Sequence, residues 1–213
     1  GYVRVLYQSH AVKVLEASGL DRLVGDDRVE GALLKDGRQI PADFVIVGVG
    51  ITPNTHLADE AGLEIDNGIA TDELGRTSDP AIWSAGDCAS FPWRGGRIRL
   101  ESVGNAIDQA EVVAANILGA GAAYEAKPWF WSDQYDLKLQ IAGLNMGYDR
   151  IVTRRGEGDV ASYWYYRGAD LLAVDSMNDS RAYMVGKRLI EMGKSPAPEV
   201  IETAADLKPL LKG

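Results

Sequence analysis

The apolar run at residues 44–50, FVIVGVG, constrains the fold of this chain more than any other feature. It contains no polar residue, which is typical of a strand of a parallel sheet that is buried on both faces. The run ends in Gly48-Val49-Gly50, and small residues at a strand end let a cofactor approach the backbone closely. Glycines that only shape a turn explain the same residues equally well. The run therefore predicts an α/β fold. It leaves open whether its glycines face a cofactor or only shape a turn.

The glycines of the chain do not complete a dinucleotide-binding turn. Such a turn normally reads G-x-G-x-x-G, because its glycines allow a tight bend and close contact with a pyrophosphate. Three G-x-G pairs begin at Gly48, Gly119 and Gly156. The position that the last glycine of the motif would take is held by Pro53, Tyr124 and Ala161, respectively. The sequence thus lacks the feature that would hold a pyrophosphate.

Charge and composition narrow the function classes. The net charge of -9 argues against nucleic acid as the main partner, because phosphate binding needs a basic field. Cys88 is the only cysteine, which rules out an internal disulfide and a C-x-x-C pair and disfavours a metal site. No apolar run approaches the ~20 residues of a membrane helix, and no secretory signal is visible. We expect a cytoplasmic protein without membrane association, and the start Gly-Tyr indicates that this is not the natural N-terminus.

Three segments differ in pattern: residues 1–52, 53–127 and 128–213. In the first, residues 4–16 mix β-branched and polar side chains and predict a strand, and the turn Asp36-Gly37 predicts a hairpin. In the second, residues 81–85 predict an apolar strand. A helix follows, with Asn105 as N-cap and Gly119 as its stop.

The third segment predicts a small α+β domain, because strand patterns are followed by a helix pattern. The strands are expected within residues 137–144, 149–155, 160–168 and 170–177. Residues 180–193 predict an amphipathic helix with four side chains facing inward, namely Tyr183, Met184, Leu189 and Met192.

Two short stretches of the second segment carry candidate chemistry. In TSDPAIWSAGDCA (77–89), Gly86 allows close backbone approach and Asp87 can accept hydrogen bonds from a polyol. In RLESVGNAIDQA (99–110), a helix begins directly after Ser102-Val103, where free N–H groups favour negative charge. An ordinary Gly-Asp turn and an ordinary helix start explain these residues as well.

Two tryptophans open the third segment. Trp129 and Trp131 lie on the same side of an extended chain because they are two residues apart. Buried tryptophans usually fill a core. Flat indole rings could instead shield a flat cofactor from water.

Taken together, four stretches resemble the C-terminal half of the FAD-dependent, NADH-using ferredoxin reductases that serve oxygenases: residues 45–55, 62–89, 99–119 and 128–144. The resemblance runs in order through nearly the whole chain, and PWFWSDQ (128–134) is its most specific motif. It implies incomplete Rossmann-like nucleotide-binding portions of the glutathione-reductase type, followed by an α+β domain. Residues 1–52 would end an NAD-binding domain, 53–127 would be the returning part of an FAD-binding domain, and 128–213 the C-terminal domain. Both glycine fingerprints would then precede this chain.

The resemblance also implies roles for individual residues. Asp87, beside Gly86, would bind the ribityl chain of FAD, and the Val103 N–H would face the flavin pyrimidine. Trp131 would lie near the isoalloxazine and Glu101 where the nicotinamide approaches, which makes these two the catalytic candidates. Gly48, Val49 and Gly50 would face the NAD(H). The family often has Gln or Pro where Gly104 stands, and Cys88 is interpreted as a packing residue.

The implied reaction carries electrons from NADH through FAD to a ferredoxin-type iron–sulfur protein, or a rubredoxin, that supplies an oxygenase. Because such partners are usually acidic, five cations become docking candidates: Arg94, Arg97, Arg99, Lys138 and Lys208. A solvated loop explains the three arginines equally well. Two alternatives stay open: a flavoprotein disulfide reductase, which would need a dithiol, and a fragment without activity that serves as a structural or docking module and associates with itself.

Overall fold

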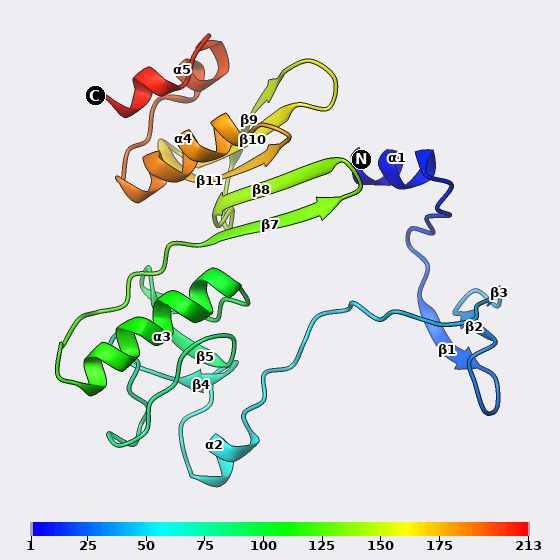
Figure 1. Ribbon diagram of the computed structural model, residues 1–213, viewed down its shortest axis with the longest axis horizontal. Coiled ribbons are helices and arrows are strands. Elements are labelled where there is room, and N and C mark those ends of the chain that lie inside the picture. Colours follow the sequence, from blue (N-terminus) through cyan, green and yellow to red (C-terminus); the bar gives the residue numbers. More distant parts are fainter. Residues whose placement is uncertain (1, 213) are drawn as a thin grey trace. The chain divides into compact units, whose positions relative to one another are not determined.

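The computed structural model describes residues 2–212 and divides the chain into two compact units, with the division between Ile51 and Thr52. Each unit is described by itself (Figure 1). Among the described residues, no helix is both long enough and apolar enough to cross a membrane.

The first unit contains one helix and a three-stranded antiparallel sheet. Their bounds are α1 Tyr2–Ser9, β1 Leu20–Val24, β2 Gly31–Leu34 and β3 Gln39–Pro41, with the strands in the order β1-β2-β3. The hairpin predicted at Asp36-Gly37 is confirmed, since this turn joins β2 to β3. The strand predicted over residues 4–16 is wrong, because residues 2–9 are helical. A helix satisfies its backbone hydrogen bonds internally, whereas a strand needs a neighbour.

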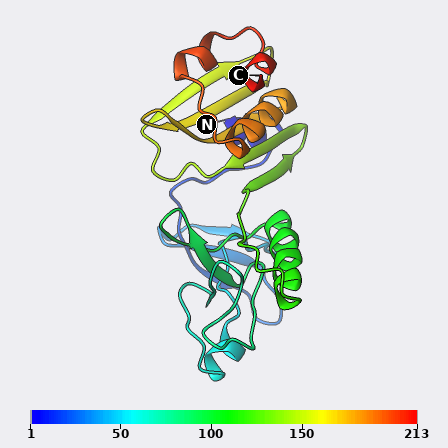
Figure 2. The ribbon, with the colours of Figure 1, turned by 90° about the vertical axis from the view of Figure 1, so that its left-hand side faces the viewer.

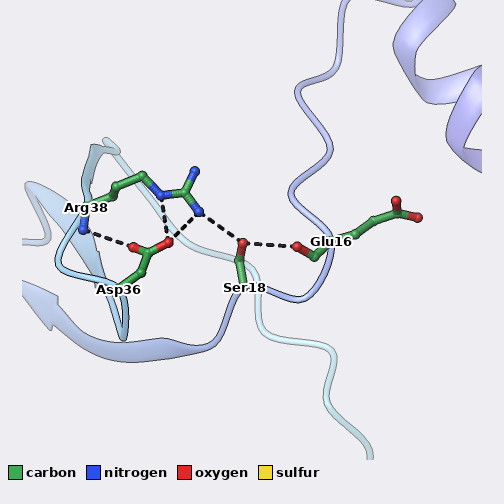
Figure 3. A network of polar contacts seen from close by, with 4 residues as sticks. All are labelled: Glu16, Ser18, Asp36 and Arg38. Atoms are coloured by element: carbon green, nitrogen blue, oxygen red, sulfur yellow. Dashed lines mark hydrogen bonds and ion pairs between the residues drawn. The ribbon is translucent and has the colours of Figure 1, made fainter.

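A polar network holds the hairpin turn (Figure 3). Arg38 Nε donates to Asp36 Oδ2 at 2.8 Å, and the Arg38 backbone N–H donates to Asp36 Oδ1 at 3.0 Å. Arg38 Nη2 donates to Ser18 Oγ, which in turn donates to the Glu16 carbonyl. The hydrogen bond from the Arg38 side chain lowers the pKa of the Asp36 carboxyl. The turn is thereby tied to the segment that enters β1.

The apolar run at 44–50 forms no strand in the structure, so the predicted buried parallel strand is not observed. Its side chains are largely exposed, with Ile46 86% and Val49 88% accessible. The sheet of this unit is an antiparallel hairpin sheet, and it does not pair with the run. A parallel strand forms only where neighbouring strands and covering helices bury it. Because this chain alone gives residues 44–50 no such neighbours, they do not form the strand that their pattern predicts.

The second unit begins with short elements around one long helix. Their bounds are α2 His56–Glu60, β4 Ile69–Ala70, β5 Ala89–Trp93, β6 Gly96–Ile98 and α3 Val103–Ile117. β4 pairs with β5 in parallel and β5 with β6 antiparallel. The strand predicted at 81–85 is wrong. Thr77 Oγ1 donates to the Ile82 carbonyl, and Asp79 Oδ1 accepts from the Ala81 N–H, so local turns replace ladder pairing.

The ends of α3 differ partly from the prediction. Ser102 is the N-cap, and its Oγ accepts from the Asn105 N–H at 3.3 Å. Asn105, predicted as the cap, lies inside the helix, where its Nδ2 donates to the Leu100 carbonyl. Gly119 follows the C-cap with a φ of 94°, so the predicted stop is confirmed.

The rest of the second unit is a five-stranded antiparallel sheet in the order β7-β8-β11-β10-β9. The bounds are β7 Trp129–Gln134, β8 Leu137–Gly143, β9 Arg150–Arg155, β10 Ala161–Arg167 and β11 Asp170–Met177, followed by α4 Ser180–Glu191, α5 Pro198–Thr203 and the 3₁₀ helix η1 Lys208–Leu211. The four predicted strands and the helix are confirmed. α4 lies along one face of the sheet (Figures 1 and 2).

The core lies on the face of this sheet that α4 covers, and residues of α4 and of the segment that follows it close the core. It is built from Val152, Trp164, Tyr166, Leu171, Val174, Ala182, Val185, Leu189, Ile201 and Leu207. Tyr183 and Leu189 are buried as predicted, but Met184 and Met192 are exposed. Met184 lies between the inward positions of α4, and Met192 is the C-cap beyond its last turn.

Candidate functional site

The turn Gly86-Asp87 is fixed to helix α3. Gly86 has a φ of 80°, and a Cβ there would meet Ala106 at an ordinary 3.5 Å, so the backbone conformation is what requires glycine. The Gly86 N–H donates to Gln109 Oε1 at 2.9 Å, and Gln109 is fully buried. Asp87 is exposed. The turn is therefore held from inside while the Asp87 carboxylate faces solvent.

Arg99 joins this turn to the residue before α3. Its Nη1 donates to the Asp87 carbonyl at 3.0 Å and pairs with Glu101 Oε1 at 2.8 Å, and the side chain is only 9% exposed. Its Nε is buried and has no hydrogen-bond partner in the part of the chain that the structure describes. Arg99 thus connects the Glu101 carboxylate with the backbone of Asp87.

The N-terminus of α3 lies next to Glu101. The first N–H groups of a helix have no partner within it, and Ser102 satisfies only that of Asn105. The N–H groups of Val103 and Gly104 are the remaining donors of this turn, and the Val103 side chain is 62% exposed. Together with the helix dipole, they favour negative charge at this point.

Trp129 lies directly against this helix start, and Trp131 stacks on Trp129. Their rings are stacked, with centroids 5.3 Å apart and planes 23° apart, which confirms that they share one side of β7. Trp131 is 49% exposed. Ser102 Oγ donates to the Trp129 carbonyl at 3.4 Å, and the Trp129 indole fills the space that a side chain at Gly104 would need. The site thus presents a stacked indole pair, in which Trp129 packs on the start of α3 and the Trp131 ring is half exposed.

The five cations predicted to dock a partner differ in their surroundings. Arg97 Nη2 donates to the carbonyls of Thr71 and Ser90, and its Nε lies 3.7 Å from Asp66. Arg97, like Arg99, is therefore occupied by internal contacts. Arg94, Lys138 and Lys208 are exposed. The Arg94 guanidinium lies over the Trp93 ring, 4.4 Å from its centroid.

The residues predicted to face NAD(H) belong to the first unit. Gly50 has a φ of 95°, and a Cβ at Gly48 or Gly50 would meet nothing within 4 Å. Gly48, Val49 and Gly50 thus form an exposed segment without helix or strand.

Two residues of the site were not anticipated from the sequence. Gln109 lies three residues after Ala106 and four before Val113, on the apolar face of α3, so a polar residue at a buried helical position was the available signal. Lys187 of α4 lies over the Trp129 ring, and nothing in its local sequence indicates this contact.

Among residues 2–212, no group of three or more histidine, cysteine or acidic side chains is placed to hold a metal ion.

Comparison with known proteins gives two family matches. The model of the pyridine nucleotide-disulphide oxidoreductases matches residues 2–110, and the model described as reductase C-terminal matches residues 129–211. The first match covers half of the chain, and the second begins where the five-stranded sheet begins.

Named relatives match over most of the chain. Rhodocoxin reductase of Rhodococcus erythropolis is 40% identical over 98% of this chain and 50% of its own length. Putidaredoxin reductase of Pseudomonas putida is 42% identical over 82% of this chain and 42% of its own. The chain spans about half the length of the curated relatives it matches.

Two solved structures are similar to the chain throughout. The ferredoxin reductase for the CYP199A2 system from Rhodopseudomonas palustris has a TM-score of 0.93 and 38% identity, over 98% of this chain and 53% of the other. A covalent putidaredoxin reductase–putidaredoxin complex has a TM-score of 0.93 and 36% identity, over 99% of this chain and 52% of the other.

Proposed function

The chain belongs to the pyridine nucleotide-disulphide oxidoreductases, and we propose that it is part of an FAD-dependent NAD(P)H:ferredoxin reductase. One observation carries the proposal. A single connected group of residues joins the Gly86-Asp87 turn, the start of α3 and the stacked tryptophans, through Gln109, Arg99 and Gly104. The named relatives are ferredoxin reductases, which supports this assignment.

The residues of the site fit the ring and sugar parts of a flavin. Asp87 offers an exposed carboxylate that can accept hydrogen bonds from ribityl hydroxyls. The Val103 and Gly104 N–H groups offer donors and a positive dipole end for the pyrimidine side. Trp131 offers a flat, half-exposed ring that can exclude water from one side of the isoalloxazine.

Bound FAD would supply the conversion between the hydride that NAD(P)H donates and the single electrons that a one-electron carrier accepts. The protein contributes orientation and electrostatic stabilisation. The start of α3 stabilises the charge that the reduced ring would carry, and the ion pair with Arg99 holds Glu101 beside the place where the nicotinamide would approach. Gly48, Val49 and Gly50 would face the nicotinamide nucleotide.

We propose a ferredoxin-type iron–sulfur protein as the electron acceptor, supplying an oxygenase. The complex of putidaredoxin reductase with putidaredoxin supports a partner of this kind. Among the five candidate cations, Arg94, Lys138 and Lys208 have exposed side chains that could attract an acidic surface. The lone Cys88 fits a reducing compartment, and we propose a cytoplasmic location.

The same proposal assigns the domains. Residues 1–52 would end the NAD-binding domain, 53–127 would be the returning part of the FAD-binding domain, and 128–213 the C-terminal domain. The match of the reductase C-terminal model to residues 129–211 supports the last boundary.

The test uses the complete protein that contains this chain. Purified with its flavin, it should lose its visible flavin absorption on anaerobic addition of NADH and should then reduce a [2Fe–2S] ferredoxin. Trp131→Phe should slow ferredoxin reduction, whereas Trp83→Phe, a change outside the connected group, should not. A protein that binds flavin but whose flavin NAD(P)H does not reduce would overturn the proposal.

A further inference from the structure

Three separate elements meet at the indole of Trp129. Trp129 lies on β7, Gly104 on the first turn of α3, and Lys187 in the middle of α4. Trp131 is stacked on Trp129. The orientation of the half-exposed Trp131 ring therefore depends on how Trp129 is held.

Gly104 holds Trp129 by lacking a side chain. A Cβ at Gly104 would lie 2.6 Å from Trp129 Nε1 and 2.9 Å from Cε2, closer than side-chain atoms pack. Gly104 is buried, and its φ is not in the left-handed region, so space and not backbone conformation requires glycine here. Any larger residue would push the indole away from α3.

Lys187 holds the same indole from α4. Its Nζ lies 5.1 Å from the centroid of the Trp129 ring, within the range of a cation–π interaction. Nζ is also 3.9 Å from Glu191 Oε1, and Arg188 Nη1 lies 3.5 Å from the other oxygen of Glu191. Arg188 therefore shares the ion partner of Lys187, whereas the cation–π contact with the Trp129 ring is made by Lys187. This neighbour provides a matched control.

We propose that Gly104 and Lys187 are positioning residues, which act on the cofactor face through Trp129 by fixing the Trp129–Trp131 stack. Gly104 sets how closely Trp129 approaches α3, and Lys187 fixes the tilt of its ring. Trp131 stacks on Trp129 in one fixed orientation only when both are present. The role of this orientation in flavin binding rests on the proposed function. The stack itself is observed independently of that function.

The stack can be measured in the 213-residue chain without any cofactor. Two stacked indoles give an exciton couplet in circular dichroism, and its disappearance in Trp129→Phe and in Trp131→Phe would assign it to this pair. We expect the couplet to be lost in Gly104→Ala. It should weaken about twofold or more in Lys187→Met, as loss of one cation–π contact implies.

Two further variants separate the ring contact from the ion pair. Lys187→Arg should restore the couplet because it returns a cation over the ring, and Arg188→Met should leave it unchanged. A couplet in Lys187→Met equal to that of the unmodified chain would overturn the proposal, as would an equal loss in Arg188→Met. Lys187 lies on a helix surface, so this arm remains informative even if Gly104→Ala does not fold.

A second readout places the effect at the cofactor. In the complete flavoprotein, a tryptophan near the isoalloxazine quenches flavin fluorescence, so Lys187→Met should raise that fluorescence while Arg188→Met should not. If Trp131→Phe leaves flavin fluorescence unchanged, the flavin contact of the proposed function fails. The couplet would still decide whether Gly104 and Lys187 position the pair.

Discussion

Asp87 is the residue whose replacement reports most directly on sugar binding, because its carboxylate is exposed while its turn is fixed from inside through Gly86 and Gln109. Removing the carboxylate should leave the turn intact. In the complete protein, Asp87→Ala should weaken FAD retention by about 1.5–3 kcal/mol, the usual value for a hydrogen bond to a charged group.

Equilibrium dialysis against FAD would measure this loss. Glu111→Ala, at an exposed position of α3, is the control and should retain FAD as the unmodified protein does. Equal FAD affinity in Asp87→Ala and the control would remove Asp87 from the site.

Gly143 is a residue where a single added carbon should be costly. Its φ is 77°, and a Cβ would lie 2.2 Å from the Leu172 carbonyl oxygen, which belongs to the backbone of β11. We expect Gly143→Ala to lower the free energy of unfolding by more than the roughly 1–3 kcal/mol of backbone strain alone. Gly168 has a φ of 57° and open space around its Cα, so Gly168→Ala should lower the free energy of unfolding by the backbone strain alone. Urea denaturation of both variants gives the comparison, and equal losses would contradict it.

The sequence predicts individual residues well where one local rule decides. The i, i+2 spacing places Trp129 and Trp131 on one side, and a Gly-Asp turn exposes Asp87. It predicts poorly where a distant partner decides. Arg99 reads as a surface cation, yet it is buried because the Asp87 carbonyl and Glu101 both lie within its reach. From the sequence, Gly104 is only a difference from the residues that the family often has at this position. The packing of Trp129 explains why glycine is required there.

At the scale of elements, the sheet of the C-terminal part carries a half-buried acid on the face away from α4. Tyr165 Oη donates to Asp175 Oδ2 at 2.7 Å. Burial raises the pKa of the Asp175 carboxyl, although the Tyr165 hydrogen bond acts in the opposite direction. The folded state thus holds the proton more tightly than the unfolded state. This contributes stability below the ordinary pKa of 3.8, and the contribution is lost as pH rises through the folded pKa.

Asp175→Asn removes this titration and keeps an acceptor for Tyr165. We expect the variant to be more stable than the unmodified chain at neutral pH, by on the order of 1 kcal/mol or less after solvent screening. The difference should vanish under acidic conditions where Asp175 is protonated. Thermal unfolding across the pH range measures it, and a constant difference at every pH would contradict the assignment.

The strands of the five-stranded sheet should exchange their amide hydrogens most slowly. β8, β10 and β11 are paired on both sides, and their residues form much of the buried core. Hydrogen exchange should show the strongest protection within residues 137–177 and the weakest in 42–55, where no strand or helix forms. Uniformly weak protection in 137–177 would contradict this expectation.

Elements were predictable from sequence where they are completed by neighbours in this chain. The strands between residues 137 and 177 and the helix α4 pair and pack with one another, so alternation and helical spacing locate them. The run at 44–50 carries an equally strong strand pattern, but it forms no ladder. An apolar strand pattern shows that a segment needs neighbouring strands and covering helices to be buried, and residues 2–51 do not supply these neighbours.

At the scale of the whole molecule, we propose that this chain carries the ring and sugar side of a flavin site, without the glycine-rich turn that would hold the pyrophosphate. The run at 44–50 also leaves a wide apolar surface, which favours association with another copy. The chain spans about half the length of its curated relatives.

One measurement tests this claim most directly: the 213-residue chain is mixed with excess FAD, the free FAD is removed, and the visible absorption is recorded together with the molar mass in solution. The account predicts a nearly colourless protein, because the pyrophosphate-binding turn is missing, and a molar mass above that of the single 23.0 kDa chain. A yellow, strictly monomeric chain that retains one FAD would contradict it.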